Sequence, residues 1–338
     1  MNKNIRLLLL LTLVFAAIYF IVVNKPWSTF KAARKDFSIS DTASITKIFI
    51  ADKRNHKVVL QRNAEGEWMV NNTWPADVQK INLVKATLHD VEVRNPLTEA
   101  EYNSMVALMA ANAVKVELYS GEELIKTIYV GGATADHTGT YMMIEGSSTP
   151  FVTHIPGFVG YLTPRFNVYP IKWKTRAVFT FTAEQIKHVS VSYPMKKNAS
   201  FELDNSTPVV RVYSKELNLD IPYDTGFVRY YLSSFNNLYF EGYDEDIPPT
   251  VADSLRQSTP YCIMDVHLNS GKSKRVQVHF KPVDRRTKSR VDEETGKAYE
   301  FDPDKYFAFI DDEKEVAYIQ HYNFGRLFKH AGDFVPRK

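Results

Sequence analysis

Alternating apolar and polar positions mark short strands at two matched places in the chain. Residues 45–50 read Ile-Thr-Lys-Ile-Phe-Ile, and residues 186–191 read Ile-Lys-His-Val-Ser-Val. Apolar side chains at every second position are typical of a strand with one buried face. A second strand is predicted after each of them, at residues 57–62 and 200–203. Both halves of the chain therefore begin with the same two elements.

Each half then changes to a helical period. Apolar residues recur at spacings of three and four, which predicts an amphipathic helix behind a candidate N-cap, Asp77 in one half and Asp224 or Thr225 in the other. The apolar positions are Val78, Ile81, Val84, Leu88 and Val91, and then Val228, Tyr231, Leu232, Phe235 and Leu238. A second helix start follows in each half, at the capping box Thr98–Glu101 and at its weaker echo Thr250–Asp253.

The clearest match between the halves is a hairpin. Residues 116–121 read Val-Glu-Leu-Tyr-Ser-Gly, and residues 266–271 read Val-His-Leu-Asn-Ser-Gly. In both, Ser-Gly ends one strand and an apolar run returns it. Closing strands begin at Tyr141 and Tyr306, so the spacing between matched segments widens after the hairpin. This widening locates an insertion, the charged stretch at residues 281–304.

The ordered series predicts an α+β protein in which an N-terminal transmembrane helix precedes two tandem, divergent copies of an antiparallel-sheet-plus-helices unit. We expect a cytoplasmic tail, membrane anchor and stalk at residues 1–36 and the first repeat at 37–164. A linker at 165–176 and the second repeat at 177–338 come next. One continuous α+β domain with a coincidental pattern is the alternative.

The N-terminal anchor is predicted from a nearly continuous apolar run, Leu7–Val23, which comes after Lys3 and Arg6. As a helix it would span ~26 Å, close to the ~30 Å hydrocarbon core of a bilayer. A cleaved signal peptide is the competing interpretation. Its weak site, Val14-Phe15-Ala16, would cut inside the apolar run, so we expect an uncleaved anchor.

Orientation rests on the type of segment, because lysines and arginines lie on both sides of the run and the positive-inside count is indecisive. A segment shaped like a signal anchor exports the part of the chain on its C-terminal side. We therefore expect a single-pass protein of the inner (cytoplasmic) membrane, with residues 24–338 in the periplasm.

Composition narrows the class of protein. The 42 basic and 39 acidic residues give a net charge of +3, which argues against a nucleic-acid binder. The 19 Tyr and 21 Phe suit a β-rich fold with aromatic cross-strand pairs. The single cysteine, Cys262, excludes an intrachain disulfide and a thiolate metal cluster.

Candidate chemistry is sparse. Ser28 and Lys31 have the Ser-x-x-Lys spacing of penicillin-recognising enzymes, but the partner motifs of those enzymes are missing. The acidic cluster at residues 241–246 lacks the spaced ligands of a Ca²⁺ loop. Trp68 and Trp74 could stack on a glycan, although core packing is the commoner use of tryptophan. We expect no catalytic residue, no metal and no cofactor.

The insertion carries the one functional hypothesis at residue level. Arg285, Arg286, Lys288 and Arg290 form a basic run, which could dock an acidic partner or anionic headgroups through charge-assisted contacts. A mobile, solvated hairpin with its tip near residues 295–297 is the alternative interpretation.

Several segments in the first half together resemble a known family. They are Ile-Thr-Lys-Ile at residues 45–48, Val-Val-Leu at 58–60, Gly-Glu-Trp-Met-Val at 66–70, Pro-Ala-Asp at 75–77, Ile-Tyr-Val-Gly-Gly at 128–132 and Gly-Thr-Tyr-Met at 139–142. The set is similar to the domain-of-unknown-function family numbered 4340, an uncharacterised family of bacterial envelope proteins. The resemblance implies one N-terminal span, an exported body with repeats, and a setting beside ABC-type transporter permeases.

These observations predict a membrane-anchored, non-enzymatic accessory or scaffold protein of the cell envelope, with a transporter permease as its partner class. A periplasmic glycan- or peptide-binding module is the alternative, since duplicated domains create clefts in which ligands bind. A hydrolase would need groups brought together from distant positions, and nothing in the sequence indicates them.

Overall fold

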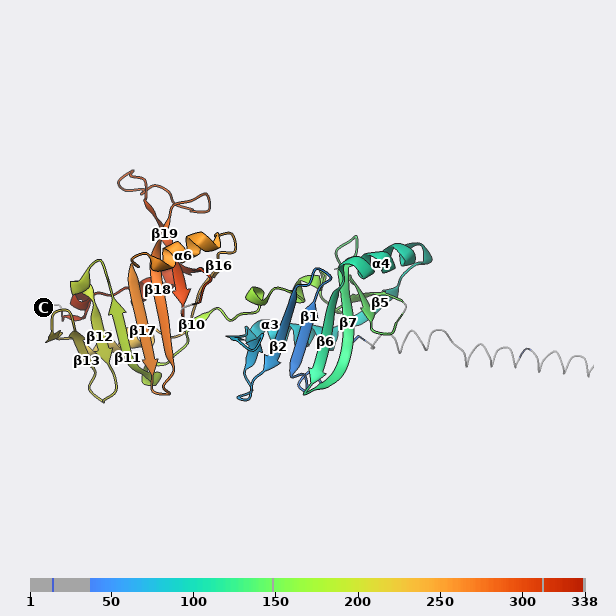
Figure 1. Ribbon diagram of the computed structural model, residues 1–338, viewed down its shortest axis with the longest axis horizontal. Coiled ribbons are helices and arrows are strands. Elements are labelled where there is room, and N and C mark those ends of the chain that lie inside the picture. The colour runs from blue at the N-terminus through green and yellow to red at the C-terminus, as the bar shows by residue number, and fades with distance from the viewer. Residues whose placement is uncertain (1–13, 15–36, 148, 312, 337–338) are drawn as a thin grey trace, which may run out of the picture. The chain divides into compact units, whose positions relative to one another are not determined.

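The computed structural model describes residues 37–147, 149–311 and 313–336, together with Val14. Within this part of the chain the fold is mixed α+β, with two large antiparallel sheets and few helices (Figure 1). The chain divides into two compact units, the first ending at Thr175 and the second beginning at Arg176. No helix of the described part is both long and apolar enough to cross a membrane. The anchor predicted at Leu7–Val23 lies, apart from Val14, outside the described residues.

The described part of the first unit is built on a nine-stranded sheet with the order β4-β3-β2-β1-β6-β7-β8-β9-β5. The first four strands run to one edge, helix α3 leads to the other edge, and α4 leads back to β6 beside β1. The bounds are β1 Lys47–Ala51, β2 Lys57–Arg62, β3 Trp68–Val70, β4 Trp74–Pro75, α3 Val78–Asp90, β5 Glu92–Pro96, α4 Glu99–Asn112, β6 Val114–Ser120, β7 Glu123–Ala133, β8 Thr140–Ile144 and β9 Phe151–His154.

The second unit repeats this strand order in its own nine-stranded sheet, β14-β13-β12-β11-β17-β18-β19-β20-β16, with β10 and β15 paired beside it. Along the chain, α5 and α6 have the same places among the strands as α3 and α4 have in the first unit. The bounds are β10 Ala177–Phe179, β11 Ile186–Ser192, β12 Phe201–Asp204, β13 Arg211–Ser214, β14 Leu219–Asp220, α5 Thr225–Ser233, β15 Leu238–Tyr239, β16 Gly242–Tyr243, α6 Pro249–Gln257, β17 Cys262–Leu268, β18 Ser273–Pro282, β19 Phe301–Ile310, β20 Ala317–Gln320 and α7 His321–Phe324.

Each helix predicted from apolar spacing packs one face into the core of its own unit. Helix α3 begins after Asp77, whose side chain accepts hydrogen bonds from the amides of Gln79 and Lys80, so the predicted N-cap is confirmed. Helix α5 begins after Asp224 but ends at Ser233. The prediction that this helix continues to Leu238 is wrong, because the chain there turns into β15.

The second helices differ at their starts. The capping box of α4 is confirmed, and the Thr98 amide donates to the Glu101 carboxylate at 3.1 Å. Its predicted echo at Thr250–Asp253 is wrong, because the N-cap of α6 is Pro248 and the helix begins two residues earlier than a Thr250 cap would place it. The fixed φ of proline suits this first turn without a side-chain cap.

Residues 165–175 are not a linker. Phe166, Val168 and Trp173 are buried in the core of the first unit, and the Asp77 amide donates to the Trp173 carbonyl at 2.7 Å. Pro170 in this stretch and Pro164 just before it belong to short 3-10 turns rather than to an extended connection. The segment thus completes the first unit, and the boundary lies between Thr175 and Arg176.

Candidate docking site on the inserted loop

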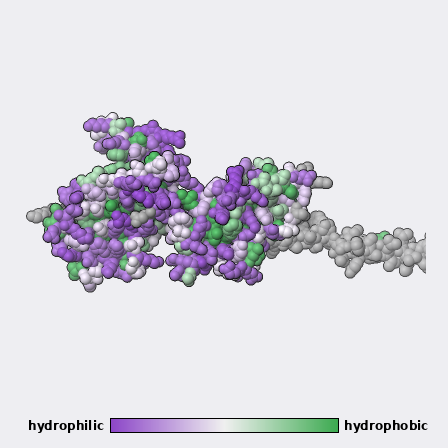
Figure 2. All heavy atoms as spheres, in the orientation of Figure 1, coloured by the Kyte–Doolittle hydropathy of each residue, from purple (hydrophilic) through white to green (hydrophobic). Residues whose placement is uncertain are grey.

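The connection between β18 and β19, residues 283–300, projects beyond the sheet of the second unit (Figure 1). We call it the inserted loop. The matching connection in the first unit, between β7 and β8, covers only residues 134–139. The projection is mainly hydrophilic in Figure 2. The two sheets share the same strand order but differ in the length of this connection, at the place where the sequence predicts an insertion.

A buried ion pair closes the base of this loop. The Lys281 side chain is 2% exposed, and its Nζ lies 3.2 Å from Asp302 Oδ2 and 3.1 Å from Asp284 Oδ2. The Thr287 hydroxyl donates to the same Asp302 oxygen at 2.9 Å, and Asp302 Oδ1 accepts the backbone amides of residues 304 and 305. Buried charges persist where such partners are in place. This cluster therefore fixes both ends of the loop.

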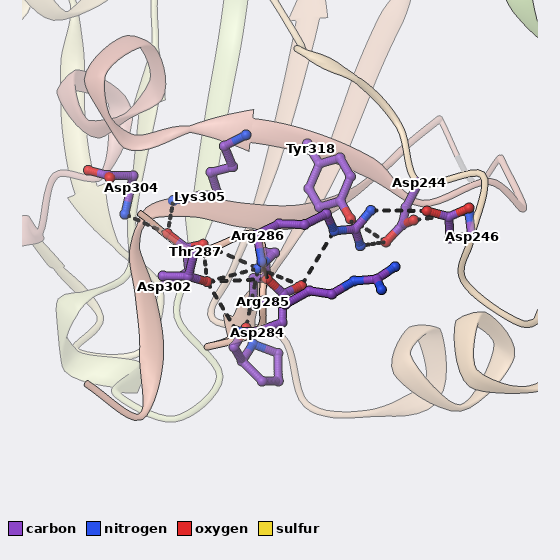
Figure 3. A network of polar contacts seen from close by, with 12 residues as sticks. Asp244, Asp246, Asp284, Arg285, Arg286, Thr287, Asp302, Asp304, Lys305 and Tyr318 are labelled. Atoms are coloured by element: carbon purple, nitrogen blue, oxygen red, sulfur yellow. Dashed lines mark hydrogen bonds and ion pairs between the residues drawn. The ribbon is translucent and has the colours of Figure 1, made fainter. Parts of the chain in front are cut away.

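Arg286 ties the loop to the neighbouring edge of the sheet (Figure 3). Its guanidinium nitrogens lie 3.3 Å from Asp244 and 3.3 Å from Asp246, just after β16. The same group donates to the Tyr318 hydroxyl on β20 at 2.8 Å, and Tyr318 in turn donates to Asp244. A planar guanidinium with several donors suits such a multiple contact.

Three groups of this network have shifted pKa values. Burial raises the pKa of Tyr318, and the hydrogen bond to Asp244 raises it further, so the phenol keeps its proton. Burial acts to raise the pKa of Asp284, but the hydrogen bond from Lys281 and the charge of Arg286 outweigh it and the pKa falls. For Arg286, burial acts to lower the pKa, and the nearby Tyr318 and Asp244 outweigh it and raise the pKa.

The outer part of the loop is a small hairpin. Val291 pairs with Ala298, and the Gly296 amide donates to the Asp292 carbonyl at 2.8 Å. The Asp292 carboxylate accepts the amides of residues 294 and 295. Gly296 has a φ of 68°, a conformation that glycine adopts without strain. The turn overlaps the tip predicted from the sequence.

The structure divides the four predicted docking cations into two groups. Arg285, Lys288 and Arg290 are exposed, and the Arg290 guanidinium donates to the Arg285 carbonyl within the loop at 3.0 Å. Arg286 is occupied by contacts within the unit. The sequence reasoning missed its partners Asp244 and Tyr318, although the acidic cluster at residues 241–246 is complementary in charge to the basic run.

A serine–histidine pair lies under α6. Ser258 Oγ is 3.2 Å from His279 Nδ1, but the serine hydroxyl donates to the Leu255 carbonyl at 2.7 Å. Gln277 Nε2 donates to a backbone carbonyl and lies 3.0 Å from His279 Nε2. The imidazole therefore accepts at Nε2 and donates at Nδ1, which is the opposite of what activation of the serine requires. Burial lowers the pKa of His279 to about 4, so the ring is neutral near pH 7. Its role is structural, because it contacts Ser258, the C-cap residue of α6.

The other candidate residues have packing roles where the structure describes them. Cys262 is buried, and burial raises the pKa of its thiol, as expected of an inert cysteine. Trp68 is buried, and the ring of Trp74 lies 4.0 Å from Lys174 Nζ. In the described part of the chain, no group of three His, Cys, Asp or Glu side chains could hold a metal ion. Ser28 and Lys31 lie outside that part.

The chain matches a known family model. The model of the family described as Domain of unknown function (DUF4340) matches residues 68–260, from β3 to just before β17. The inserted loop lies beyond the matched residues. No curated protein and no solved structure matches the chain.

Proposed function

The chain belongs to the DUF4340 family of domains of unknown function, and from that premise we propose that it is a non-enzymatic accessory or scaffold protein of the bacterial cell envelope. In this proposal Leu7–Val23 anchors it in the inner membrane, and the rest of the chain lies in the periplasm. Its partner is an envelope protein, of which an ABC-type transporter permease is the class that the family setting suggests. The two sheets would be divergent copies that arose by internal duplication, which the shared strand order supports.

The observation that carries the proposal is the inserted loop. Its base is fixed by the Lys281–Asp302 pair and by Arg286, while Arg285, Lys288 and Arg290 face solvent. A fixed base lowers the entropy lost when the loop binds, so its exposed cations can contribute more to affinity. Guanidinium and ammonium groups keep their charge near neutral pH and recognise carboxylates by charge-assisted hydrogen bonds. This arrangement suits docking to an acidic protein surface.

Affinity purification from native membranes tests the docking role. Replacing Arg285, Lys288 and Arg290 by Glu should abolish recovery of a stoichiometric partner, because like charges would then meet across the interface. The matched control changes exposed acids of the same hairpin, with Glu293→Gln and Glu294→Gln, and should keep the partner. If the native chain is recovered alone, or if the charge-reversed chain keeps its partner, the docking role is wrong.

Protease accessibility tests the proposed topology. Protease added to intact spheroplasts should digest the body of the chain, since residues 24–338 are proposed to face outward. Protection of the body until the membrane is lysed would reverse this orientation.

A further inference from the structure

A short loop of the first unit presents apolar side chains to solvent. It lies between β9 and the 3-10 turn at Thr163–Arg165, and we call residues 157–161 the apolar loop. Phe158, Val159 and Tyr161 are 39%, 86% and 40% exposed. Single exposed apolar residues are ordinary on protein surfaces, but three so close together on one loop make it a candidate contact surface.

Contacts with residues next to the apolar loop fix its conformation. The Leu162 amide donates to the buried Thr140 hydroxyl at 2.7 Å, and the Leu162 side chain is buried. Arg165 donates to Thr87 Oγ1 at 2.7 Å, and its guanidinium carbon lies 4.5 Å from the centre of the Phe158 ring. These contacts fix the conformation in advance, so little further ordering is needed when the loop binds.

The position of the apolar loop relates it to the anchor. Ser38 and Ser40, next to the start of the described chain, line a cleft of about 450 Å³ together with Ile155 and Pro156, just before the loop. Residues 24–36 join this point to the predicted anchor, and fully extended they reach at most ~45 Å. In the proposed function, the chain coming from the anchor therefore enters the first unit beside the apolar loop.

We propose that Phe158, Val159 and Tyr161 form a second contact with the lipid bilayer, at the boundary between headgroups and acyl chains. This inference rests on the membrane anchoring in the proposed function. Tyrosine suits that boundary because its ring is apolar and its hydroxyl is polar. Asp90 and Glu92 line the neighbouring cleft, so the attraction is apolar and does not depend on anionic lipid. A small apolar contact binds weakly alone, so here it orients a unit that the anchor already holds.

Site-specific labelling of the full chain in phosphatidylcholine nanodiscs tests this contact. Cys262 is buried, so a thiol-reactive, environment-sensitive fluorophore should report only on an introduced cysteine. The test variant is Val159→Cys. The controls are Leu124→Cys, 50% exposed in the same unit, and Val209→Cys, 73% exposed in the second unit. With nitroxide-labelled acyl chains in the disc, the label at position 159 should be quenched several-fold more than at either control position, and its emission should shift to the blue.

The outcomes separate this inference from the function on which it rests. Equal quenching at all three positions, in a chain that is bound to the nanodisc, overturns the lipid contact and leaves the anchor intact. Quenching at Leu124→Cys as strong as at Val159→Cys also overturns it, because the unit would then lie on the bilayer without using this loop. A chain that does not bind the nanodisc at all overturns both the contact and the proposed anchoring.

Discussion

The side chain of Lys281 illustrates how much one buried charge can determine. It lies at the end of β18 with 2% of its surface exposed, between the carboxylates of Asp284 and Asp302. Removing one partner of a buried pair leaves an uncompensated charge, which costs far more than removal of an exposed pair. The base of the inserted loop therefore depends on this residue, whereas Lys288, only a few positions away, is exposed.

We predict that Lys281→Met destabilises the second unit by about 3 kcal/mol, because the buried Asp302 carboxylate loses its counter-charge. For a unit of this size the unfolding midpoint should fall by roughly 6–12 °C, measured by thermal unfolding. Lys288→Met is the matched control and should change stability by less than about 0.5 kcal/mol. The double variant Lys281→Met with Asp302→Leu should recover part of the loss. A midpoint unchanged in Lys281→Met would contradict the buried pair.

His279 predicts a pH dependence of stability. Burial lowers its pKa to about 4 in the folded chain, whereas an unfolded histidine titrates near 6.5. Between these values the unfolded state binds a proton that the folded state does not, so stability is full above pH ~6.5 and falls as the pH decreases to ~4. The expected loss is up to about 3 kcal/mol.

Denaturant unfolding across this pH range measures the effect, and His279→Asn is the comparison. The asparagine amide can still donate toward Ser258 but cannot take up a proton, so its stability should depend less steeply on pH between ~4 and ~6.5. Identical pH slopes in the two proteins would show that His279 is not the group responsible.

Among the secondary-structure elements, α3 and α5 follow equivalent strands of the two sheets, β4 and β14, but differ in length. Each starts behind an aspartate N-cap and buries an apolar stripe against its own sheet. Helix α3 runs to Asp90, whereas α5 ends at Ser233 and gives way to irregular chain and β15. The cap and the buried face are shared, and the length is not.

The N-cap of α3 gives a prediction with a conservative control. Asp77→Ala should cost about 1 kcal/mol, since the amides of Gln79 and Lys80 lose their acceptor. Asp77→Asn keeps a side-chain oxygen at that place and should cost only a few tenths of a kcal/mol. Chemical denaturation of the two variants distinguishes them, and equal losses would mean that the charge, rather than the cap, stabilises the helix.

Each unit of the whole molecule has its own hydrophobic core. In the second unit the core gathers aromatic residues, with Phe201, Tyr231 and Phe334 in mutual ring contact. The core of the first unit is mainly aliphatic, around Ile48, Ile81 and Leu118. Two sheets with the same strand order are thus filled with different side chains. The order of strands tolerates such repacking as long as volume and pattern are kept.

We predict that residues 176–338 fold as an independent unit, because the core residues of the second unit all come from that stretch. Expressed alone, this segment should show one cooperative unfolding transition in denaturant. Lys281→Met should lower its midpoint there as it does in the full chain. A broad, non-cooperative transition would show that the second unit needs the first.

The sequence by itself determined most of the local structure. Apolar residues at every second position identified the paired strands, and apolar residues at spacings of three and four identified α3. This works because the spacing of apolar residues determines which face of a strand or helix can be buried. The hairpin at residues 116–121 and its match at 266–271 became β6–β7 and β17–β18. The cap residues Asp77 and Thr98 were also readable, since capping depends on amides only two or three residues away.

The tertiary structure alone decided contacts between distant segments. Residues 165–175 look like a linker because Pro170 lies within them and Pro164 just before them. Trp173 is nevertheless buried, and whether a site for its ring exists depends on elements far away in the chain. In the sequence, Arg286 looks like one more exposed cation of a basic run. Its partner Asp244 precedes α6 in the chain, whereas Arg286 follows it, so the two are far apart in sequence. Local spacing carries no record of which distant charges meet, because their meeting depends on strand order and register, and these are properties of the whole sheet.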